Sequence, residues 1–270
     1  MRKASLAVAI LLTLALAAAE EKQNYQSLPS FLFENTYKTE SSFKRGLNTV
    51  LGQATCFAVD LSAYGYSGKR IVITAGHFTE NKMENKLKEE MTVRIRTREG
   101  FEWVKAKVLA VDFSRDIALL VLDYEVDSLA KLAKKDNLKR GDALVGVGAP
   151  GGAAITPTEG YLLSKENEDG DEEIKDGWWQ ASFPISPGNS GGPVWDPNRK
   201  EIVGIVAAGQ ASAYGISPNV AYFVSLSSLD KFLRSDAVRK SLQEVAEAEK
   251  QEKNEEKEKR KSQPHALKRK

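Results

Sequence analysis

Short runs of apolar and β-branched residues, separated by polar, Gly and Pro positions, extend from about Thr55 to Val224. Runs of this kind are typical of β-strands. This density of strands predicts an all-β fold, either a sandwich or a pair of barrels, rather than alternating helices and strands. The clearest predicted strands cover residues 70–75, 91–97, 103–111, 117–122, 143–147, 158–163, 201–206 and 220–224.

The pattern changes after the last strand. Leu229, Phe232, Leu233 and Val238 have the spacing of an amphipathic helix over residues 227–242 that packs on the domain. From there to Lys270 the chain is almost wholly Glu, Lys, Arg and Gln. Without an apolar stripe, residues 237–270 are predicted to form a solvated helix or a disordered tail, with a docking arm as the less favoured alternative.

Two polar segments interrupt the strand region. Residues 127–140 are Lys-rich and lie near its middle, so they are the predicted boundary between two half-domains. Residues 165–176 are acidic and separate two predicted strands, which is typical of a long solvated loop. A contact between this loop and a partner is the alternative.

The first nineteen residues have the composition of an export signal. Arg2 and Lys3 precede an apolar stretch over 6–16, and three alanines at 17–19 form a small-residue cleavage site. The apolar stretch is shorter than the ~20 residues of a spanning helix, so we expect cleavage and no stable membrane span. Residues 20–44 are then an N-terminal extension and residues 45–236 the folded domain, in a secreted or periplasmic protein.

Charge and cysteine usage exclude several functions. Removal of residues 1–19 brings the formal net charge from +2 to about zero, so no general attraction to nucleic acid is implied. Cys56 is the only cysteine and excludes an intramolecular disulfide. Its apolar neighbours favour a small buried residue over a nucleophile. One cysteine and two distant histidines do not make a usual zinc site, and we expect no metal and no cofactor.

One serine lies in a glycine-rich turn, Gly188-Asn189-Ser190-Gly191-Gly192-Pro193. Glycines allow a tight turn that brings backbone N–H groups close to a reacting carbonyl. A serine nucleophile also needs a base, most often histidine. His265 lies in the charged tail, whereas His77 directly follows an apolar strand. His77 is therefore the candidate base, and a turn with an incidental serine is the alternative.

A histidine base in turn needs a carboxylate that orients the imidazole. Asp116 directly precedes the predicted strand over 117–122, so it would be held at the edge of the core. Asp112 and Asp123 flank it, and spacing alone leaves both as alternatives.

Three segments carry a family resemblance: Thr74-Ala75-Gly76-His77, Asp116-Ile117-Ala118-Leu119-Leu120 and the glycine-rich turn around Ser190. In this order they resemble the signature blocks of the chymotrypsin/trypsin-like serine peptidases. The likeness is greatest to the bacterial HtrA/Deg-type branch and spans residues 52–233. It implies two six-stranded antiparallel β-barrels and a serine endopeptidase acting on polypeptides.

The resemblance also implies a role for each matching residue. Ser190 attacks the scissile carbonyl to form an acyl-enzyme, His77 acts as base and then acid, and Asp116 fixes the histidine tautomer. The N–H groups of Gly188 and Ser190 form the oxyanion hole. Ala207, Ala208 and Gly209 lie where the family binds the substrate backbone as an added strand.

The sequence also departs from the family pattern. Asn189 replaces the aspartate that pairs with a new N-terminus in digestive members, so zymogen activation of that type is not expected. Phe78 replaces a cysteine, and Ala207 lacks a hydroxyl that commonly supports the triad aspartate. Pro184 occupies the place of the acidic specificity residue, which predicts a preference for small or medium apolar side chains.

The remaining alternative concerns function. HtrA-type proteins commonly append a PDZ domain, and the charged tail is expected to leave no room for one. A secreted binding protein or pseudoenzyme on the same fold is the second hypothesis. Retention of all three triad candidates favours the enzyme, because binding requires none of them.

Overall fold

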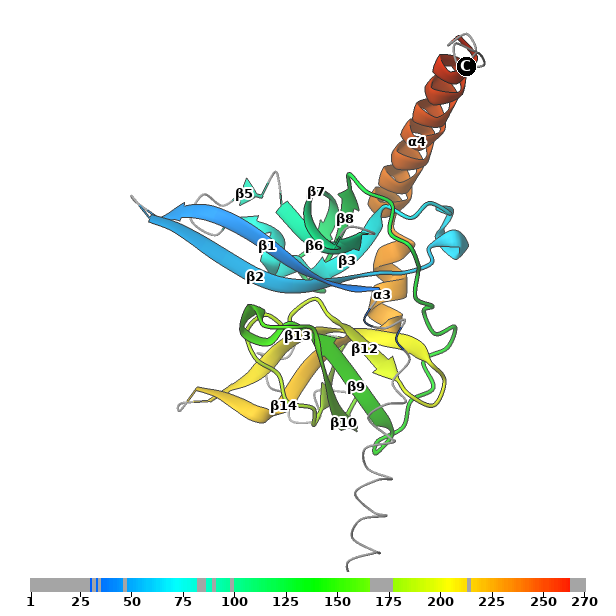
Figure 1. Cartoon of the computed structure of the whole chain (residues 1–270). Coiled ribbons are helices and arrows are strands. Elements are labelled where there is room, and N and C mark those ends of the chain that lie inside the picture. Colours follow the sequence, from blue (N-terminus) through cyan, green and yellow to red (C-terminus); the bar gives the residue numbers. More distant parts are fainter. Residues whose placement is uncertain are drawn as a thin grey trace, which may run out of the picture.

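The structure is a computed structural model that describes residues 30, 33, 35–45, 48–81, 86–88, 91–97, 100–165, 177–212 and 215–262. The predicted export signal, His265 and residues 166–176 of the acidic run lie outside the described residues. Two β-barrels lie one above the other, with two helices at one side (Figure 1).

The first barrel closes in the order β1-β2-β3-β8-β7-β6. Its neighbouring strands are antiparallel, and the pairing of β1 with β6 closes the ring. A short hairpin of β4 and β5 and two single 3-10 turns, η1 and η2, accompany it. The bounds are β1 (Thr36–Arg45), β2 (Asn48–Ala58), η1 (Ser62–Tyr64), β3 (Ile71–Ala75), η2 (Gly76–Thr79), β4 (Glu80–Asn81), β5 (Lys86–Leu87), β6 (Met91–Thr97), β7 (Gly100–Asp112) and β8 (Ile117–Leu122).

The second barrel closes in the order β10-β11-β14-β13-β12-β9. The predicted pair of six-stranded antiparallel barrels is therefore confirmed, and the sandwich alternative is wrong. Residues 123–142 connect the two barrels. The bounds are β9 (Ala143–Gly148), η3 (Pro150–Gly152), β10 (Thr156–Ser164), β11 (Trp178–Ala181), β12 (Pro193–Asp196), β13 (Glu201–Ser212) and β14 (Gly215–Ser225).

Each barrel has its own apolar interior, and a third cluster lies between them. Cys56, Val72 and Leu120 belong to the cluster of the first barrel, and Val203 and Phe223 to that of the second. The cluster between the barrels combines residues of both with residues of the helices: Phe57, Ile73, Leu119, Ile205, Ala207, Val224, Leu229, Phe232, Val238 and Leu242. Its burial fixes the two barrels against each other and so determines the geometry of any site at their junction.

The first barrel begins earlier than the sequence analysis predicted. β1 covers residues 36–45, so the predicted domain start at residue 45 is wrong. The inward positions of β1 are Tyr37, Thr39 and Ser41, which are all buried. Every second side chain of β1 therefore faces the interior, but each of these three has a hydroxyl group. The buried Thr39 hydroxyl has a hydrogen-bond partner, because its Oγ1 donates to the carbonyl of Thr92 at 3.0 Å. A strand with polar residues on its buried face has no apolar alternation for a sequence pattern to detect.

Two helices replace the single predicted one over residues 227–242. α3 (Leu226–Leu233) is capped at its N-terminus by Ser225, whose side chain accepts a hydrogen bond from the N–H of Ser228. α4 (Asp236–Ser262) follows after a break, because the Ser235 hydroxyl accepts from the N–H of Val238 at 3.4 Å and caps a new helix.

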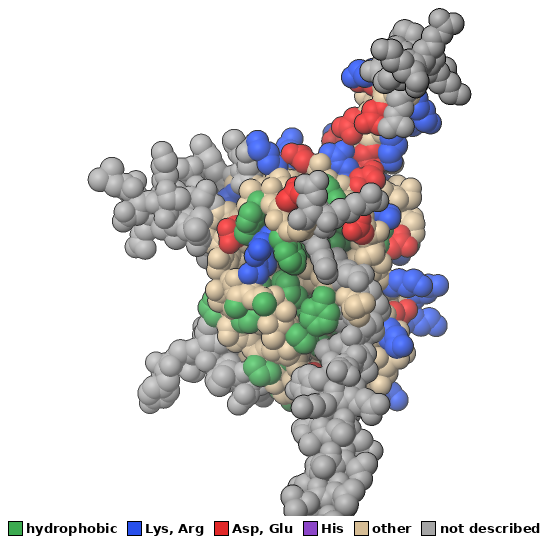
Figure 2. Space-filling view, viewed as in Figure 1, with side chains coloured by type: hydrophobic (Ala, Val, Ile, Leu, Met, Phe, Trp, Pro, Cys, Tyr) green, Lys and Arg blue, Asp and Glu red, His purple; other side chains and the backbone are tan. Residues whose placement is uncertain are grey.

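The predicted limit between domain and tail at residue 236 is also wrong. Val238 and Leu242 of α4 are 0% and 1% exposed and belong to the cluster between the barrels. Farther along α4, Glu249 accepts from the Tyr66 hydroxyl at 2.6 Å, and Glu252 pairs with Arg70 at 3.0 Å. Beyond these contacts α4 projects from the barrels with charged side chains around it (Figures 1 and 2). In the part of the chain with a described structure, no helix has the length and apolar character needed to cross a bilayer.

Truncations of α4 test this division. Deletion of residues 254–270 should leave the free energy of unfolding unchanged within about 0.5 kcal/mol, because the described side chains there are exposed. Deletion of residues 236–270 should lower it by about 3 kcal/mol or more, since Val238 and Leu242 lose their buried sites. Chemical denaturation of both variants measures the difference. Equal stabilities would contradict a structural role for the first turns of α4.

Candidate active site

The imidazole of His77 lies at the junction of the two barrels. His77 belongs to η2, the single turn that directly follows β3, and its side chain is 45% exposed. Gly76 precedes it and allows η2 to approach the next element closely. A Cβ at Gly76 would lie 3.0 Å from the Ile117 nitrogen and 3.1 Å from the carbonyl carbon of Asp116. The glycine therefore brings His77 next to Asp116.

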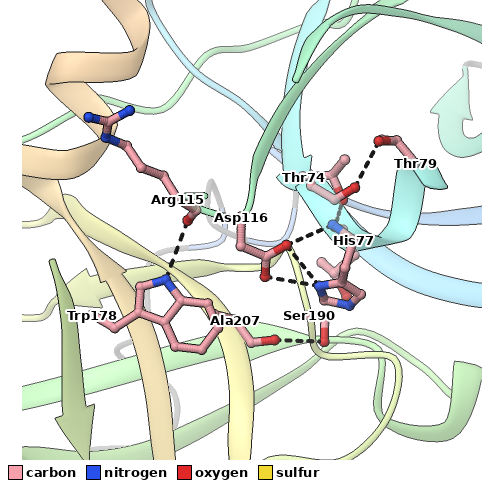
Figure 3. Close-up of polar contacts among 10 residues, drawn as sticks. Thr74, His77, Thr79, Arg115, Asp116, Trp178, Ser190 and Ala207 are labelled. Carbon is pink, nitrogen blue, oxygen red and sulfur yellow. Dashed lines mark hydrogen bonds and ion pairs between the residues drawn. The ribbon is translucent and has the colours of Figure 1, made fainter. Parts of the chain in front are cut away.

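Asp116 occupies the turn between β7 and β8 in an unusual conformation. Its φ is +62°, a left-handed region that few non-glycine residues adopt and in which aspartate is more frequent than most. The residue is 2% exposed, so its carboxylate is removed from water. Trp178 of the second barrel donates from Nε1 to the carbonyl of Arg115 at 3.4 Å, which links this turn to the opposite barrel (Figure 3).

The carboxylate of Asp116 holds His77 at two points. Its Oδ1 accepts a hydrogen bond from the backbone N–H of His77 at 2.7 Å. Its Oδ1 and Oδ2 lie 3.0 and 2.9 Å from Nδ1 of the imidazole. Because an ionised carboxylate only accepts, Nδ1 carries the proton and Nε2 is left as the acceptor that faces away from Asp116. This is the tautomer that a general base requires.

The structure separates Asp116 from the two alternative carboxylates. Asp112 accepts from the Ser114 hydroxyl at 2.6 Å and from the Arg115 N–H at 3.0 Å, and it forms an ion pair with the Arg115 side chain. Burial raises the pKa of Asp112, but these hydrogen bonds and the Arg115 charge outweigh it and lower the net pKa. Asp123 is exposed. Neither contacts His77 among the described interactions.

Ser190 comes from the second barrel. Figure 3 shows its hydroxyl just below the imidazole ring. Within the described part of the chain, Ser190 Oγ donates to the carbonyl of Ala207 at 3.2 Å and not to His77. Its own carbonyl accepts from the N–H of Thr55 in the first barrel at 2.9 Å. The structure thus joins His77 to Asp116 by hydrogen bonds, and Figure 3 shows the Ser190 hydroxyl near this pair.

The loop before Ser190 presents two backbone N–H groups. The carbonyl of Pro187 accepts from the N–H of Gly151 at 2.7 Å, and the carbonyl of Asn189 accepts from the N–H of Gly192 at 3.0 Å. In a trans peptide the N–H points opposite to the carbonyl, so these bonds direct the N–H groups of Gly188 and Ser190 away from the loop interior. No described residue accepts from either group, which leaves both for an external oxygen.

Gly188 is required by this loop. Its φ is +101°, and an added Cβ would lie 2.3 Å from the carbonyl oxygen of Ala149. The tight turn predicted from the glycine-rich segment therefore corresponds to a close approach between two loops of the second barrel. Gly151 of η3 was not predicted from the sequence, because a glycine in a Pro-Gly-Gly turn gives no local sign of a contact with Pro187.

Ala207, Ala208 and Gly209 lie on β13 beside Ser190. Ala208 and Gly209 pair on one side with Tyr222 and Ala221 of β14, and Ala207 lies at a register shift in this pairing. On the other side the described pairing of β13 with β12 ends at Ile205, and Val206 bonds to Gly191 and Gly192. The edge of β13 therefore extends beyond its pairing with β12. On this edge the Ala207 carbonyl accepts from the Ser190 hydroxyl.

Cys56 has no access to this chemistry. It is fully buried in the interior of the first barrel, and burial raises the pKa of its thiol far above the ordinary value. A neutral buried thiol is a poor nucleophile, which agrees with the structural role expected for Cys56.

A comparison with protein-family models decides the family. The model of the trypsin-like peptidase domain matches residues 54–205. The chain belongs to this family. The matched part of the trypsin-like peptidase domain includes the end of β2, η2, the Asp116 turn and the Ser190 loop.

Curated relatives of this trypsin-like peptidase domain are named as bacterial serine proteases. A "Probable periplasmic serine endoprotease DegP-like" of Pseudomonas fluorescens is 34% identical over 139 residues, which are 51% of this chain and 28% of the relative. A "Putative serine protease HhoB" of Synechocystis is 27% identical over 128 residues, or 46% of this chain and 30% of the relative. The chain thus spans less than a third of these relatives.

Solved structures agree on the fold. The active form of the Rv3671c protease from M. tuberculosis has a TM-score of 0.57 at 21% identity and covers 76% of this chain and 81% of that chain. An HtrA-type protease, AlgW with a tripeptide, has a TM-score of 0.56 at 21% identity, with 75% and 62% covered. At this identity the likeness establishes only the architecture of the trypsin-like peptidase domain. The assignment of site residues depends on the contacts within this chain.

Proposed function

We propose that this chain is a serine endopeptidase that hydrolyses peptide bonds through Ser190, His77 and Asp116 and an acyl-enzyme intermediate. The observation that carries the proposal is the double contact of the buried Asp116 carboxylate with the backbone N–H and Nδ1 of His77, which leaves Nε2 of the imidazole as an acceptor. A carboxylate in this position stabilises the imidazolium that forms when His77 takes the serine proton. The family and the names of the relatives support the same reaction.

In the proposed mechanism a bound peptide first releases the Ser190 hydroxyl. The edge of β13 at residues 207–209 offers backbone groups to an extended peptide, which adds as a further strand. A substrate N–H that bonds to the Ala207 carbonyl competes with the 3.2 Å bond from Ser190 Oγ. The freed hydroxyl then turns to Nε2 of His77. Catalytic hydrogen bonds that are loose without substrate commonly tighten in this way.

The covalent steps then follow from the same groups. Ser190 Oγ attacks the scissile carbonyl carbon while its proton passes to Nε2 of His77, and the carbonyl oxygen becomes an oxyanion. The N–H groups of Gly188 and Ser190 accommodate this oxyanion, and donors of this kind contribute about 3 kcal/mol each to the transition state. His77 gives its proton to the leaving amine, and water activated by His77 hydrolyses the acyl-enzyme.

The proposal extends to the setting of the reaction. The polypeptide substrate needs only an extended segment, since the β13 edge recognises backbone groups. We propose export to the periplasm or the exterior, supported by the N-terminal composition and by the periplasmic relatives. Because the chain spans only part of those relatives, their other activities and partners are not transferred to it.

Labelling with a fluorophosphonate probe tests the function directly. The probe reacts with a serine only when a base activates the hydroxyl, so wild-type protein should be labelled and Ser190→Ala should not. Mass spectrometry of the adduct identifies the modified serine. If the folded wild-type protein and Ser190→Ala are equally unreactive, a binding protein on this fold replaces the enzyme.

A further inference from the structure

A threonine of the first barrel contacts the proposed oxyanion loop of the second barrel. Thr55 lies on β2, is fully buried, and is 133 positions away in sequence from its partner Gly188. Its hydroxyl donates to the carbonyl of Gly188 at 2.7 Å and accepts from the N–H of Ala149 at 3.0 Å. One hydroxyl therefore joins two loops of the opposite barrel, and both its donor and its acceptor functions are used.

The backbone of Thr55 adds a third connection. Its N–H donates to the carbonyl of Ser190 at 2.9 Å. The carbonyls of Gly188 and Ser190, on either side of Asn189, are thus both held by Thr55. Since each peptide unit is planar, fixing these carbonyls restricts how the peptides between them can rotate.

The Ala149 contact restrains the same loop from its other side. Ala149 directly precedes η3, the turn in which the Gly151 N–H binds the carbonyl of Pro187 at 2.7 Å. That bond sets the direction of the Gly188 N–H, one of the two proposed oxyanion donors. The Thr55 hydroxyl therefore connects the two segments whose relative placement decides where this N–H points.

We propose that Thr55 is a positioning residue for the oxyanion hole. The inference rests on the proposed function and extends it: Thr55 does not touch substrate, and it acts through Gly188 and Ser190. Loss of its hydroxyl leaves the Ala149 N–H and the Gly188 carbonyl without these partners in a buried place, which favours rearrangement of the loop. A shift of the oxyanion hole weakens its hydrogen bonds to the transition state, and it affects the binding of the substrate less.

The chain offers a matched control. Thr39 is also fully buried in the first barrel, and its hydroxyl donates to a carbonyl, that of Thr92, at 3.0 Å. None of its described contacts involves residues 149–152 or 186–192. Thr39→Val and Thr55→Val each remove one buried hydroxyl at nearly constant volume, so a general loss of stability affects both.

Enzyme kinetics on a peptide substrate give the first test. Thr55→Val should lower kcat by about tenfold or more with KM changed by less than about threefold, since the lost interaction belongs to the transition state. It should weaken inhibition by a peptide aldehyde, whose adduct places an oxygen in the oxyanion hole, by a similar factor. Thr55→Ser should restore kcat to within about threefold of wild type, because the hydroxyl is retained. Equal kcat values for Thr55→Val and Thr39→Val would overturn the proposal.

Amide hydrogen exchange gives a test that does not depend on turnover. In Thr55→Val, exchange of residues 149–152 and 186–192 should be about tenfold faster than in wild type or Thr39→Val, as expected for one lost hydrogen bond. Unchanged exchange there would overturn the positioning role even if the enzyme is active. Absence of Ser190-dependent labelling in wild type would instead overturn the proposed function. If Thr55→Val does not fold, Thr55→Ala takes its place in both measurements.

Discussion

Replacement of His77 by alanine is expected to lower kcat for peptide hydrolysis by about 10⁶-fold, the loss typical of removing the base of a serine protease triad. The reason is that Ser190 then has no group to accept its proton, and no other described histidine is available. The 45% exposed side chain contributes little packing, so the melting temperature should stay within a few degrees of wild type. Steady-state kinetics and a thermal melt of the same preparation measure both.

His265→Ala is the matched control for this variant. It removes the only other histidine of the chain, which lies in the charged C-terminal segment. We expect its kcat to equal that of wild type within about twofold. A reversed result, with His265→Ala inactive and His77→Ala active, would exclude His77 as the base.

Replacement of Asp116 by asparagine is expected to lower kcat by about 10⁴-fold. Asparagine adopts a φ near +60° readily, so the turn is retained. Its carbonyl oxygen can still accept from the backbone N–H of His77, which places its NH₂ group against Nδ1 of the imidazole. Nδ1 then becomes an acceptor and Nε2 carries the proton, so His77 can no longer receive one from Ser190.

The two neighbouring aspartates provide the comparison for Asp116. Asp123→Asn should leave kcat within about twofold of wild type, and Asp112→Asn within about tenfold, since Asp112 braces the turn that contains Asp116. The kinetics of all three variants identify the acid. A loss of about 10⁴-fold at Asp112 or Asp123, with Asp116→Asn active, would assign the role to another carboxylate.

The catalytic candidates differed in how much the sequence could predict about them. Ser190 was recognisable because glycines surround it, and His77 because the alternative histidine lies in a segment without apolar residues. Three aspartates within twelve positions could not be separated by pattern. The contact with His77 depends on the left-handed backbone at Asp116 and on the space left by Gly76, which are properties of the packed turns.

The predicted boundaries of the domain were wrong for a related reason. β1 buries threonine and serine on its inner face and satisfies them by hydrogen bonds, so its sequence resembles a polar segment. The C-terminal helical region is divided into α3 and α4 at Ser235, which caps α4. The spacing of apolar residues does not reveal such a cap.

The sequence alone determined the class of fold and two of the three proposed catalytic residues. Strand periodicity and the glycine-framed serine are local properties, and each can be recognised within about ten consecutive residues. Only the tertiary structure showed which aspartate contacts His77, which bonds orient the Gly188 N–H, and that Thr55 contacts the proposed oxyanion loop. These contacts join residues that are far apart in the chain, 39 positions for His77 and Asp116 and 133 for Thr55 and Gly188, and such contacts leave no local pattern in the sequence.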